Sequence, residues 1–169
     1  TRYAGASSAP ILEVFGRKFR ISEVARVMQP GCQVDTMPVL QGAQGLGKSS
    51  FFRALAGDAW FRDDPIDIRH KDAAMALEGV WIYEMAELSS VRVRDAESTK
   101  AFLSRRVESF RRPYERTVTR IPRQVVFVGT TNESAFLSDP TGARRYWPVP
   151  VVSMPDLHAL HADREQLWA

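Results

Sequence analysis

One stretch of eight residues limits the possible folds of this chain more than any other feature. Residues 42–49 read Gly-Ala-Gln-Gly-Leu-Gly-Lys-Ser, which has the spacing of a phosphate-binding loop. An apolar run at 37–40 precedes the loop, and a segment of helical character at 50–55 follows it. Such a loop is built between a strand and a helix, so this order predicts an α/β domain. A chance glycine-rich turn is the less favoured alternative.

The residue types in the loop suit a nucleoside triphosphate. Glycine has no Cβ, so the loop glycines would let successive main-chain N–H groups turn toward phosphate oxygens. Lys48 would reach the β- and γ-phosphates, and the Ser49 hydroxyl would take one Mg²⁺ position. The first N–H groups of the following helix, at its positive dipole end, would bind the same anion. We therefore predict that ATP and Mg²⁺ bind at Gly42, Gln44, Gly45, Gly47, Lys48, Ser49 and Ser50.

Length and composition fit one ordinary globular domain. The 169 residues suffice for a core of their own, and 44% hydrophobic with 25% charged residues is typical of a soluble protein. No apolar run approaches the length needed to cross a bilayer, so we expect no membrane contact. Cys32, the single cysteine, cannot form an intrachain disulfide, which is compatible with the cytoplasmic location that we expect.

The positive charge is almost entirely arginine. The net charge is +3, and only four of the 23 basic residues are lysines. Arginine offers planar, paired donors that suit phosphate, although codon use in a GC-rich genome would give the same total. Local clusters are therefore more informative than the sum. Basic residues gather between 105 and 123 and again at Arg144 and Arg145.

Hydrophobic periodicity divides the chain into alternating strands and helices. Apolar runs predict strands at 37–40, 60–61, 80–83, 125–128 and 146–149. Helical spacing predicts helices at 11–28 with an interruption at Gly16, and at 50–55, 72–77, 96–110 and 157–168. Residues 114–121 have strand character with polar alternation and would form a protruding hairpin or loop, and Pro148 predicts an edge position for the last strand.

Strands that alternate with helices favour a mostly parallel sheet covered on both faces. With the phosphate loop, this predicts an α/β fold of the P-loop NTPase type, ASCE/AAA+-like, built as a three-layer sandwich. We expect a lead-in and helix at 1–34, the ATPase core at 35–150, and at 151–169 a C-terminal helix that is cut short.

Phosphoryl transfer also needs a carboxylate for Mg²⁺ and a group that orients the attacking water. Glu84 sits at the carboxyl end of an apolar strand, where nucleotide sites open in α/β sheets, and Glu87 follows three residues later. One acid would serve the metal and the other would polarise water, and spacing does not decide between them. Glu87 could instead cap a helix. Asn132 ends another apolar strand and would hold the water or contact the γ-phosphate, unless it is a turn residue.

The arginine pair is a candidate for transition-state stabilisation. Arg144 and Arg145 precede the predicted last strand, in the sequence Arg-Arg-Tyr-Trp-Pro. An arginine presented on a loop can act as a finger on a neighbouring subunit's nucleotide, with an effect of about 10³ to 10⁵ in rate. The alternative is a surface ion pair, which contributes at most about 1 kcal/mol.

Several of these motifs together resemble one family, the virulence-associated protein E family of P-loop ATPases from phages, prophages and mobile islands, which is related to superfamily 3 helicases. The similarity extends from 24 to 168 and is carried by the segments 42–49, 81–88, 100–104, 111–114, 129–132 and 144–148.

The resemblance implies roles for individual residues. It identifies Lys48 and Ser49 with the Walker A element, Glu84 and Glu87 with the Walker B element, and Asn132 with the sensor. It further implies that Arg144 or Arg145 acts across a subunit boundary, and that the domain works as a ring-forming ATPase that translocates DNA.

The resemblance also implies a DNA-contacting region. In the related helicases, a lysine after Walker B and a hairpin before the sensor strand face the central channel. The matching residues here are Lys100, Arg111, Tyr114 and Arg116. Arg112 and Glu115 stand where proline and glycine are expected, which puts the tight turn of this hairpin in doubt. The alternative is a solvated, arginine-rich helix face.

The favoured function is a Mg²⁺-dependent ATPase module of a superfamily 3-like DNA helicase or primase-helicase, used in phage or mobile-element replication. Its expected partners are single-stranded DNA, further copies of the chain in a hexamer-like ring, and a primase domain or protein. A small-molecule kinase shares the loop but not the other motifs. A nucleotide-gated DNA-binding or phage-interference factor with weak or no hydrolysis remains the main alternative.

Overall fold

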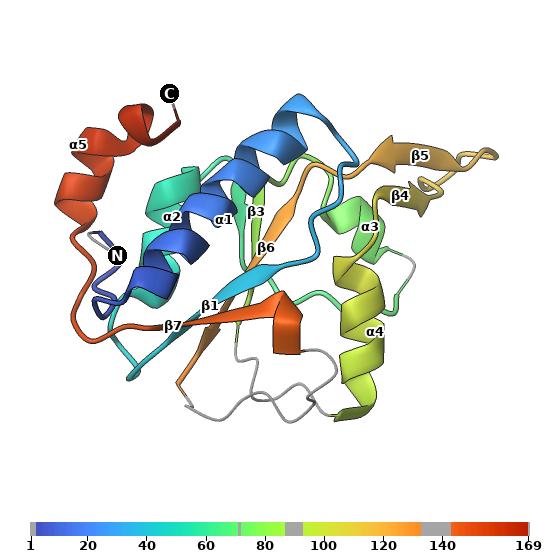
Figure 1. The fold of residues 1–169 in the computed structure, drawn as a ribbon. Coiled ribbons are helices and arrows are strands. Elements are labelled where there is room, and N and C mark those ends of the chain that lie inside the picture. The colour runs from blue at the N-terminus through green and yellow to red at the C-terminus, as the bar shows by residue number, and fades with distance from the viewer. Residues whose placement is uncertain (1–2, 71, 87–92, 133–142, 169) are drawn as a thin grey trace.

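The computed structural model describes residues 3–70, 72–86, 93–132 and 143–168. Helices and strands alternate along most of the chain (Figure 1). In chain order the elements are α1 (Pro10–Met28), β1 (Met37–Gln41), α2 (Lys48–Ala56), β2 (Phe61–Arg62), α3 (Ala73–Ala76), β3 (Ile82–Met85), α4 (Val93–Leu103), β4 (Val107–Phe110), β5 (Thr119–Pro122), β6 (Val126–Thr131), the 3₁₀ turn η2 (Ala143–Arg145), β7 (Tyr146–Pro150) and α5 (Leu157–Trp168).

The central sheet has five strands in the order β2-β3-β6-β1-β7, and all four strand pairs are parallel. This confirms the predicted α/β fold with a mostly parallel sheet. Strand β6 lies between β1 and β3 and hydrogen bonds to both. Strand β7 is an edge strand, as predicted from Pro148, which has no N–H to donate to a further strand.

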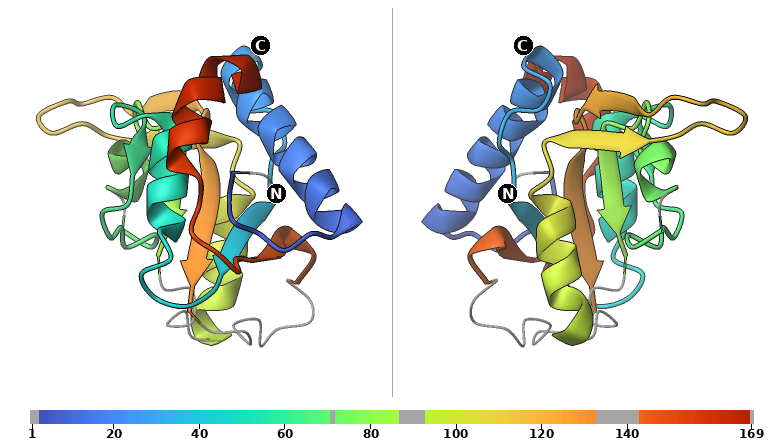
Figure 2. Two further views of the ribbon diagram at one scale, coloured as in Figure 1. Left: turned by 90° about the vertical axis from the view of Figure 1, so that its left-hand side faces the viewer. Right: turned by 90° about the vertical axis from the view of Figure 1, so that its right-hand side faces the viewer.

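Helices cover both faces of this sheet (Figures 1 and 2). Neighbouring residues of one strand point to opposite faces, so the central strands are apolar on both faces until they reach the polar residues near their carboxyl ends. One face packs against α1, α2 and α5, and its buried residues include Phe19, Leu40, Phe52, Ile82, Val126 and Leu160. The other face packs against α3 and α4, and its buried residues include Val39, Leu77, Tyr83, Phe102 and Phe127.

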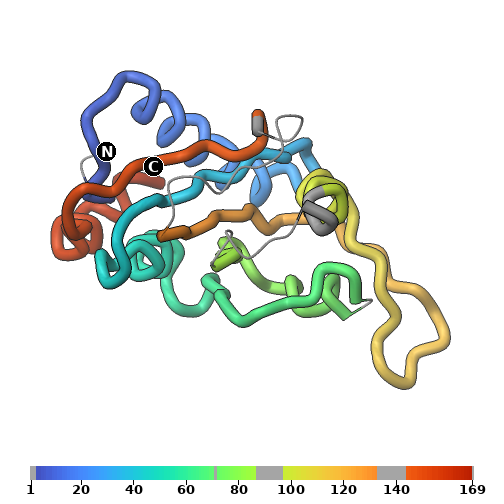
Figure 3. Tube along the Cα trace, turned by 90° about the horizontal axis from the view of Figure 1, so that it is seen from below, coloured from blue at the N-terminus to red at the C-terminus, as the bar shows by residue number. Residues whose placement is uncertain are grey.

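The predicted helix at 96–110 is wrong in its second half. Helix α4 ends at Leu103, and residues 107–110 form β4, which pairs antiparallel with β5. Along β4, exposed and buried residues alternate, with Glu108 and Phe110 inward. The segment forms a strand and not a helix because this alternation turns Glu108 inward, where it forms a buried ion pair with Arg123. The β4–β5 hairpin stands out from the body of the molecule (Figures 2 and 3).

Two smaller differences from the sequence prediction concern strand register and a glycine. Strand β3 begins two residues later than predicted, because Ile82 is the residue that pairs with Val126 of β6. Glu84 therefore lies inside the strand instead of after it. Helix α1 continues through Gly16, where we expected an interruption. The predicted elements at 37–40, 146–149 and 157–168 agree with β1, β7 and α5 to within one residue.

The two ends of the described chain are joined. Ala6 forms an antiparallel bridge with Val151, and the Tyr3 hydroxyl donates a 2.7 Å hydrogen bond to Asp163 of α5. Residues 3–7 therefore pack beside the segment that follows β7. Among the described residues, no helix is both long and apolar enough to cross a membrane.

A carboxyl group is buried in α1 without a partner. The Glu23 side chain is fully buried, and neither of its oxygens has a hydrogen-bond partner in the described part of the chain. Burial raises the pKa of Glu23 well above its ordinary value, and nearby Arg20 opposes this in part. The folded state therefore holds the Glu23 proton more tightly than the unfolded chain does.

Glu23→Gln should stabilise the fold at alkaline pH. Wild-type stability falls as pH rises from the unfolded pKa of about 4.3 toward the raised folded pKa, because the folded state must give up a proton that it binds tightly. Glutamine does not titrate and escapes this loss. Urea unfolding at about pH 8 and about pH 5 should show a gain that shrinks as pH falls. An equal change at both pH values would contradict the account.

Candidate functional site

The phosphate loop takes a backbone shape that requires glycine. Gly45 and Gly47 have φ of 82° and 72°, in the left-handed region that side chains with a Cβ rarely adopt. Gly47 is the N-cap of α2, so the first N–H groups of that helix face the loop. Of the other predicted loop residues, Gln44 and Ser50 are exposed, with Ser50 in the first turn of α2.

Lys48 is held across the loop. Its ammonium group donates to the main-chain oxygens of Gly42 and Ala43, both at 2.8 Å, and to Asn132 Oδ1 at 2.9 Å. Asn132 follows β6, so Lys48 joins the loop after β1 to the end of the neighbouring strand. The Lys48 side chain is largely buried, which lowers its pKa, and the nearby carboxylate of Glu84 opposes this shift.

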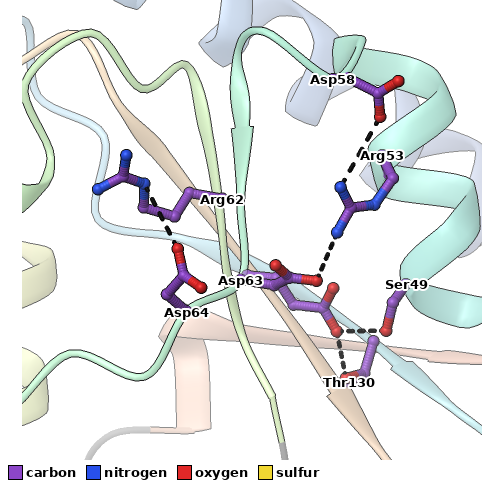
Figure 4. A network of polar contacts seen from close by, with 8 residues as sticks. Ser49, Arg53, Asp58, Arg62, Asp63, Asp64 and Thr130 are labelled. Carbon is purple, nitrogen blue, oxygen red and sulfur yellow. Dashed lines mark hydrogen bonds and ion pairs between the residues drawn. The ribbon is translucent and has the colours of Figure 1, made fainter.

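Glu84 of β3 is the centre of a second polar cluster. Its Oε1 accepts hydrogen bonds from Ser49 Oγ at 2.7 Å and from Thr130 Oγ1 at 2.6 Å. In Figure 4, the dashed lines from Ser49, at the start of α2, and from Thr130, in β6, meet at this one oxygen. Glu84 is 1% exposed, and its Oε2 is buried without a hydrogen-bond partner among the described residues.

The strand order brings these groups together. Parallel strands end at the same edge of the sheet, and β6, inserted between β1 and β3, contributes Thr130 and leads directly into Asn132. Sequence reasoning predicted Lys48, Ser49, Glu84 and Asn132, and the structure connects all four. It missed Thr130, although two consecutive threonines at the end of an apolar strand were a usable signal. Predicted Glu87 lies outside the described residues.

The residues around Glu84 fit a magnesium ion. Mg²⁺ prefers hard oxygen ligands and usually binds through one or two protein groups plus phosphate oxygens. Ser49 Oγ and Glu84 Oε1 lie 2.7 Å apart, and the unpartnered Glu84 Oε2 supplies a further buried oxygen. An unpaired buried carboxylate oxygen is costly, and a bound cation would remove that cost.

The arginine pair is distant from this chain's own loop. Arg144 and Arg145 lie in η2, which precedes β7, and Tyr146 of β7 is level with Met37 at the start of β1. At about 3.3 Å per residue, five residues separate Arg145 from the loop end of the sheet by roughly 16 Å, farther than an arginine side chain extends. Arg145 is mostly buried and lies 3.7 Å from Asp35, whereas Arg144 is exposed.

The predicted DNA-contacting residues separate into two groups. Arg111, Tyr114 and Arg116 are exposed in the connection between β4 and β5, and Tyr114 has a positive φ of 67°. Lys100 is buried in α4, where its ammonium group donates a 2.9 Å hydrogen bond to Glu97. Arg112, at the base of the connection, forms an ion pair with Glu78.

Comparison with known proteins gives a family and a fold. The family described as the virulence-associated protein E-like domain matches residues 1–169, which confirms the resemblance drawn from the sequence. No curated protein matches the chain. Two solved structures of the NrS-1 C-terminal region, its apo structure and its A-form apo structure, are similar with TM-scores of 0.63 and 0.59, each at 14% identity.

The likeness to the NrS-1 structures concerns the fold alone, because the identity is low. It covers 94% and 90% of this chain but only 42% and 40% of those chains. The chain thus spans less than half the length of the proteins that it resembles in structure.

Gly42→Ala should distort the loop. A Cβ at Gly42 would lie 2.7 Å from the main-chain oxygen of Val151 and 3.1 Å from a Leu46 methyl group. We expect a loss of about 1 to 3 kcal/mol in the free energy of unfolding, measured with urea.

Gly16→Ala is the matched control. A Cβ at Gly16 meets nothing within 4 Å, and the residue is inside α1, so alanine should stabilise by about 0.5 to 1 kcal/mol. If both variants change stability in the same direction, the steric account of the loop is wrong.

Proposed function

This chain belongs to the virulence-associated protein E-like family, and we propose that it is the Mg²⁺-dependent ATPase module of a superfamily 3-like DNA helicase or primase-helicase, used in phage or mobile-element replication. One observation carries the proposal. Ser49 at the end of a phosphate loop shares the buried Glu84 carboxylate with Thr130, while Lys48 bonds to the loop and to Asn132. These are the groups that phosphoryl transfer needs at one edge of a sheet.

The fold supports the same assignment. We propose that the domain is a P-loop NTPase of the ASCE/AAA+-like class, because a strand that ends in a polar residue is inserted between the loop strand β1 and the carboxylate strand β3. Strand β6 has that position here, and it carries Asn132 at its end. A small-molecule kinase would share the phosphate loop, but the Thr-Thr-Asn strand end at 130–132 and the arginine pair at 144–145 argue against that function.

Each residue at the loop would act through its charge and position. Main-chain N–H groups of the loop and of the start of α2 bind phosphate oxygens. The ammonium group of Lys48 is partly shielded from water by burial, so it attracts a phosphate oxygen more strongly than an exposed lysine would. Mg²⁺, held at Ser49 and Glu84, would neutralise charge on the β- and γ-phosphates. Asn132 would hold the attacking water or contact the γ-phosphate.

The geometry of η2 supports catalysis across subunits. Arg144 and Arg145 are too far from the loop of their own chain, so an arginine finger from this segment must serve a neighbouring copy. Arg145 is mostly buried beside Asp35, and Arg144 is exposed. We therefore assign the finger to Arg144 and a structural role to Arg145. A homo-oligomeric ring brings each finger to the next site.

The hairpin supports a contact with DNA. Arg111 and Arg116 offer exposed guanidinium groups for phosphates, and Tyr114 offers a ring on which an unpaired base can stack. Single-stranded DNA is the partner that uses both. Lys100 joins this site only if it leaves its ion pair with Glu97, so we expect it to contribute less than the exposed residues.

Lys48→Ala should abolish ATP hydrolysis, and Glu84→Gln should retain bound nucleotide while turnover falls. Loss of the Lys48 charge removes the main side-chain partner of the phosphates, whereas Glu84→Gln leaves the loop and Lys48 to hold the nucleotide and weakens the metal contact that turnover needs. Phosphate release and filter retention of labelled ATP measure the two effects. The matched control is Lys18→Ala, because Lys18 is an exposed lysine of α1, and this variant should turn over ATP like the wild type.

Normal turnover by Glu84→Gln would refute the metal assignment. Absence of turnover by the wild type in the presence of DNA would favour the alternative function, a nucleotide-gated binding factor.

Arg144→Ala should lower ATP hydrolysis by about 10³-fold or more, as for other fingers, without loss of ATP binding. Because the finger acts in trans, a mixture of Arg144→Ala and Lys48→Ala subunits should regain part of the activity. In some interfaces of the mixed ring, the Arg144→Ala subunit supplies an intact phosphate loop and the Lys48→Ala subunit supplies an intact Arg144. Arg145→Ala should instead lower thermal stability. A mixture as inactive as its two components would contradict action across subunits.

Arg116→Ala should weaken binding of single-stranded DNA and reduce the slope of log affinity against log salt by about 1, since one phosphate contact is lost. Fluorescence anisotropy of a labelled oligonucleotide at several salt concentrations measures both. Arg17→Ala, an exposed arginine of α1, should leave the slope unchanged. An equal effect of the two substitutions would show that overall charge, and not the hairpin, attracts DNA.

A further inference from the structure

A buried arginine connects the hairpin to the rest of the domain. Arg123 follows β5 and precedes β6, and its side chain has no exposed surface. Its guanidinium group pairs with Glu108 of β4 and donates to the main-chain oxygen of Phe102, at the end of α4, at 2.5 Å. It also stacks over the rings of Phe102 and Phe127, at 4.9 and 5.1 Å from their centroids. One side chain thus contacts the hairpin, a helix and a sheet strand.

The main chain of Arg123 adds further attachments. Its N–H donates to the Arg106 oxygen at 2.9 Å, and its carbonyl accepts from the Gly31 N–H at 2.9 Å and from Arg26 at 3.1 Å. Arg26 is itself fully buried in α1. We call Arg123, Glu108 and Arg26 the hairpin junction. A displacement of the hairpin base must move this junction, because its bonds lead to β4, to the end of α4 and to α1.

The strand that leaves the junction ends in the nucleotide site. From Val126 to Thr131, every residue of β6 is buried, so this strand moves as a unit with its neighbours. At its far end, Thr130 bonds to Glu84, and Asn132 bonds to Lys48. Strand β6 therefore leads from the segment next to Arg123 to the residues that contact Glu84 and Lys48.

The hairpin base has room to move. A cavity of about 650 Å³ opens beside the junction and is lined by Val27, Trp60, Trp81, Phe110 and Ile121, together with Glu108 and Arg123. On this side, Phe110 of β4 and Ile121 of β5 line the cavity. The hydrogen-bonded junction thus lies next to a cavity, an arrangement in which the β4–β5 hairpin can turn about the junction as about a hinge.

Stability alone gives little reason for a charge at this position. Burial of Arg123 lowers its pKa to about 10, with Glu108 opposing the shift, so the group is charged at neutral pH and bears a desolvation cost. Apolar residues of similar volume often replace buried ion pairs without loss of stability. The Arg123 guanidinium bonds to the Glu108 carboxylate and to the Phe102 carbonyl at the same time. These directional bonds fix the orientation of β4 relative to the end of α4, which an apolar residue cannot do.

We propose that Arg123 is a positioning residue that couples the β4–β5 hairpin to the nucleotide site through β6. The inference rests on the proposed function, in which the loop binds ATP and the hairpin binds DNA. Coupling of two sites is reciprocal: a nucleotide that alters DNA affinity is matched by DNA that alters nucleotide affinity by the same factor. Arg123 sets the size of this factor without contact to either ligand.

The test measures this factor in the full chain. Anisotropy of a labelled oligothymidylate gives its affinity with and without a non-hydrolysable ATP analogue, and calorimetry gives the affinity for the analogue with and without the DNA. In the wild type, both ratios should agree and should lie within roughly 5- to 150-fold, the usual range of coupling.

Two variants disconnect the junction in different ways. Arg123→Lys keeps the charge opposite Glu108 but cannot reach the Phe102 carbonyl at the same time. The double substitution Glu108→Leu with Arg123→Met removes the pair and fills its volume with apolar groups, which protects the fold if the lysine variant is unstable. Leu160→Ala is the control, since it creates a buried defect on the opposite face of the sheet.

Both junction variants should bring the two ratios close to one while each ligand alone binds as it does to the wild type. Leu160→Ala should lower stability and keep the wild-type ratios. Unchanged ratios in both junction variants, or a wild-type ratio of one, would overturn this inference while the proposed function stands. A wild type that binds neither ligand would overturn the proposed function as well.

Discussion

The structure depends on one shared carboxylate. Glu84 Oε1 accepts hydrogen bonds from Ser49, at the start of α2, and from Thr130, near the end of β6. These bonds hold three elements in one geometry at the carboxyl edge of the sheet. Bonds to an ionised, buried acceptor are stronger than those between neutral groups, so the cluster orients the edge as well as stabilising it. The polar groups of the proposed ATPase site are placed by these contacts.

Strand order explains why one end of the sheet carries the proposed nucleotide-binding residues and the other end carries the contacts that hold the β4–β5 hairpin. Insertion of β6 between β1 and β3 brings a threonine and an asparagine between the loop and the carboxylate. The same strand begins three residues after Arg123, which holds the base of the hairpin. Strand β6 is buried along its whole length, and in the proposed coupling it transmits displacement from one end to the other. A domain that must relate nucleotide state to a DNA contact would benefit from this arrangement.

Much of this could be predicted from the sequence, for physical reasons that differ by region. The phosphate loop and the buried strands have strong local signals, so Lys48, Ser49 and Glu84 were found together with their elements. The hairpin was partly missed because Val107 and Phe110 also fit a helical period. The ion pair of Glu108 with Arg123, which forms in the core between residues from different segments, favours a strand over a helix at 107–110, and it cannot be read from local spacing. Thr130 and Arg123 were missed as site and junction residues because their roles arise from strand order, which one sequence does not specify.

The most direct test of the account is whether Mg²⁺ and the triphosphate bind at this carboxylate together. Calorimetric titration of the wild-type chain with a non-hydrolysable ATP analogue should show binding in Mg²⁺ that is at least about tenfold weaker in EDTA, since the metal joins the phosphates to Ser49 and Glu84. With alanine at Ser49, this difference should largely disappear. Equal affinity in Mg²⁺ and EDTA, or a difference that survives the loss of the Ser49 hydroxyl, would contradict the assignment of this edge as a metal–nucleotide site.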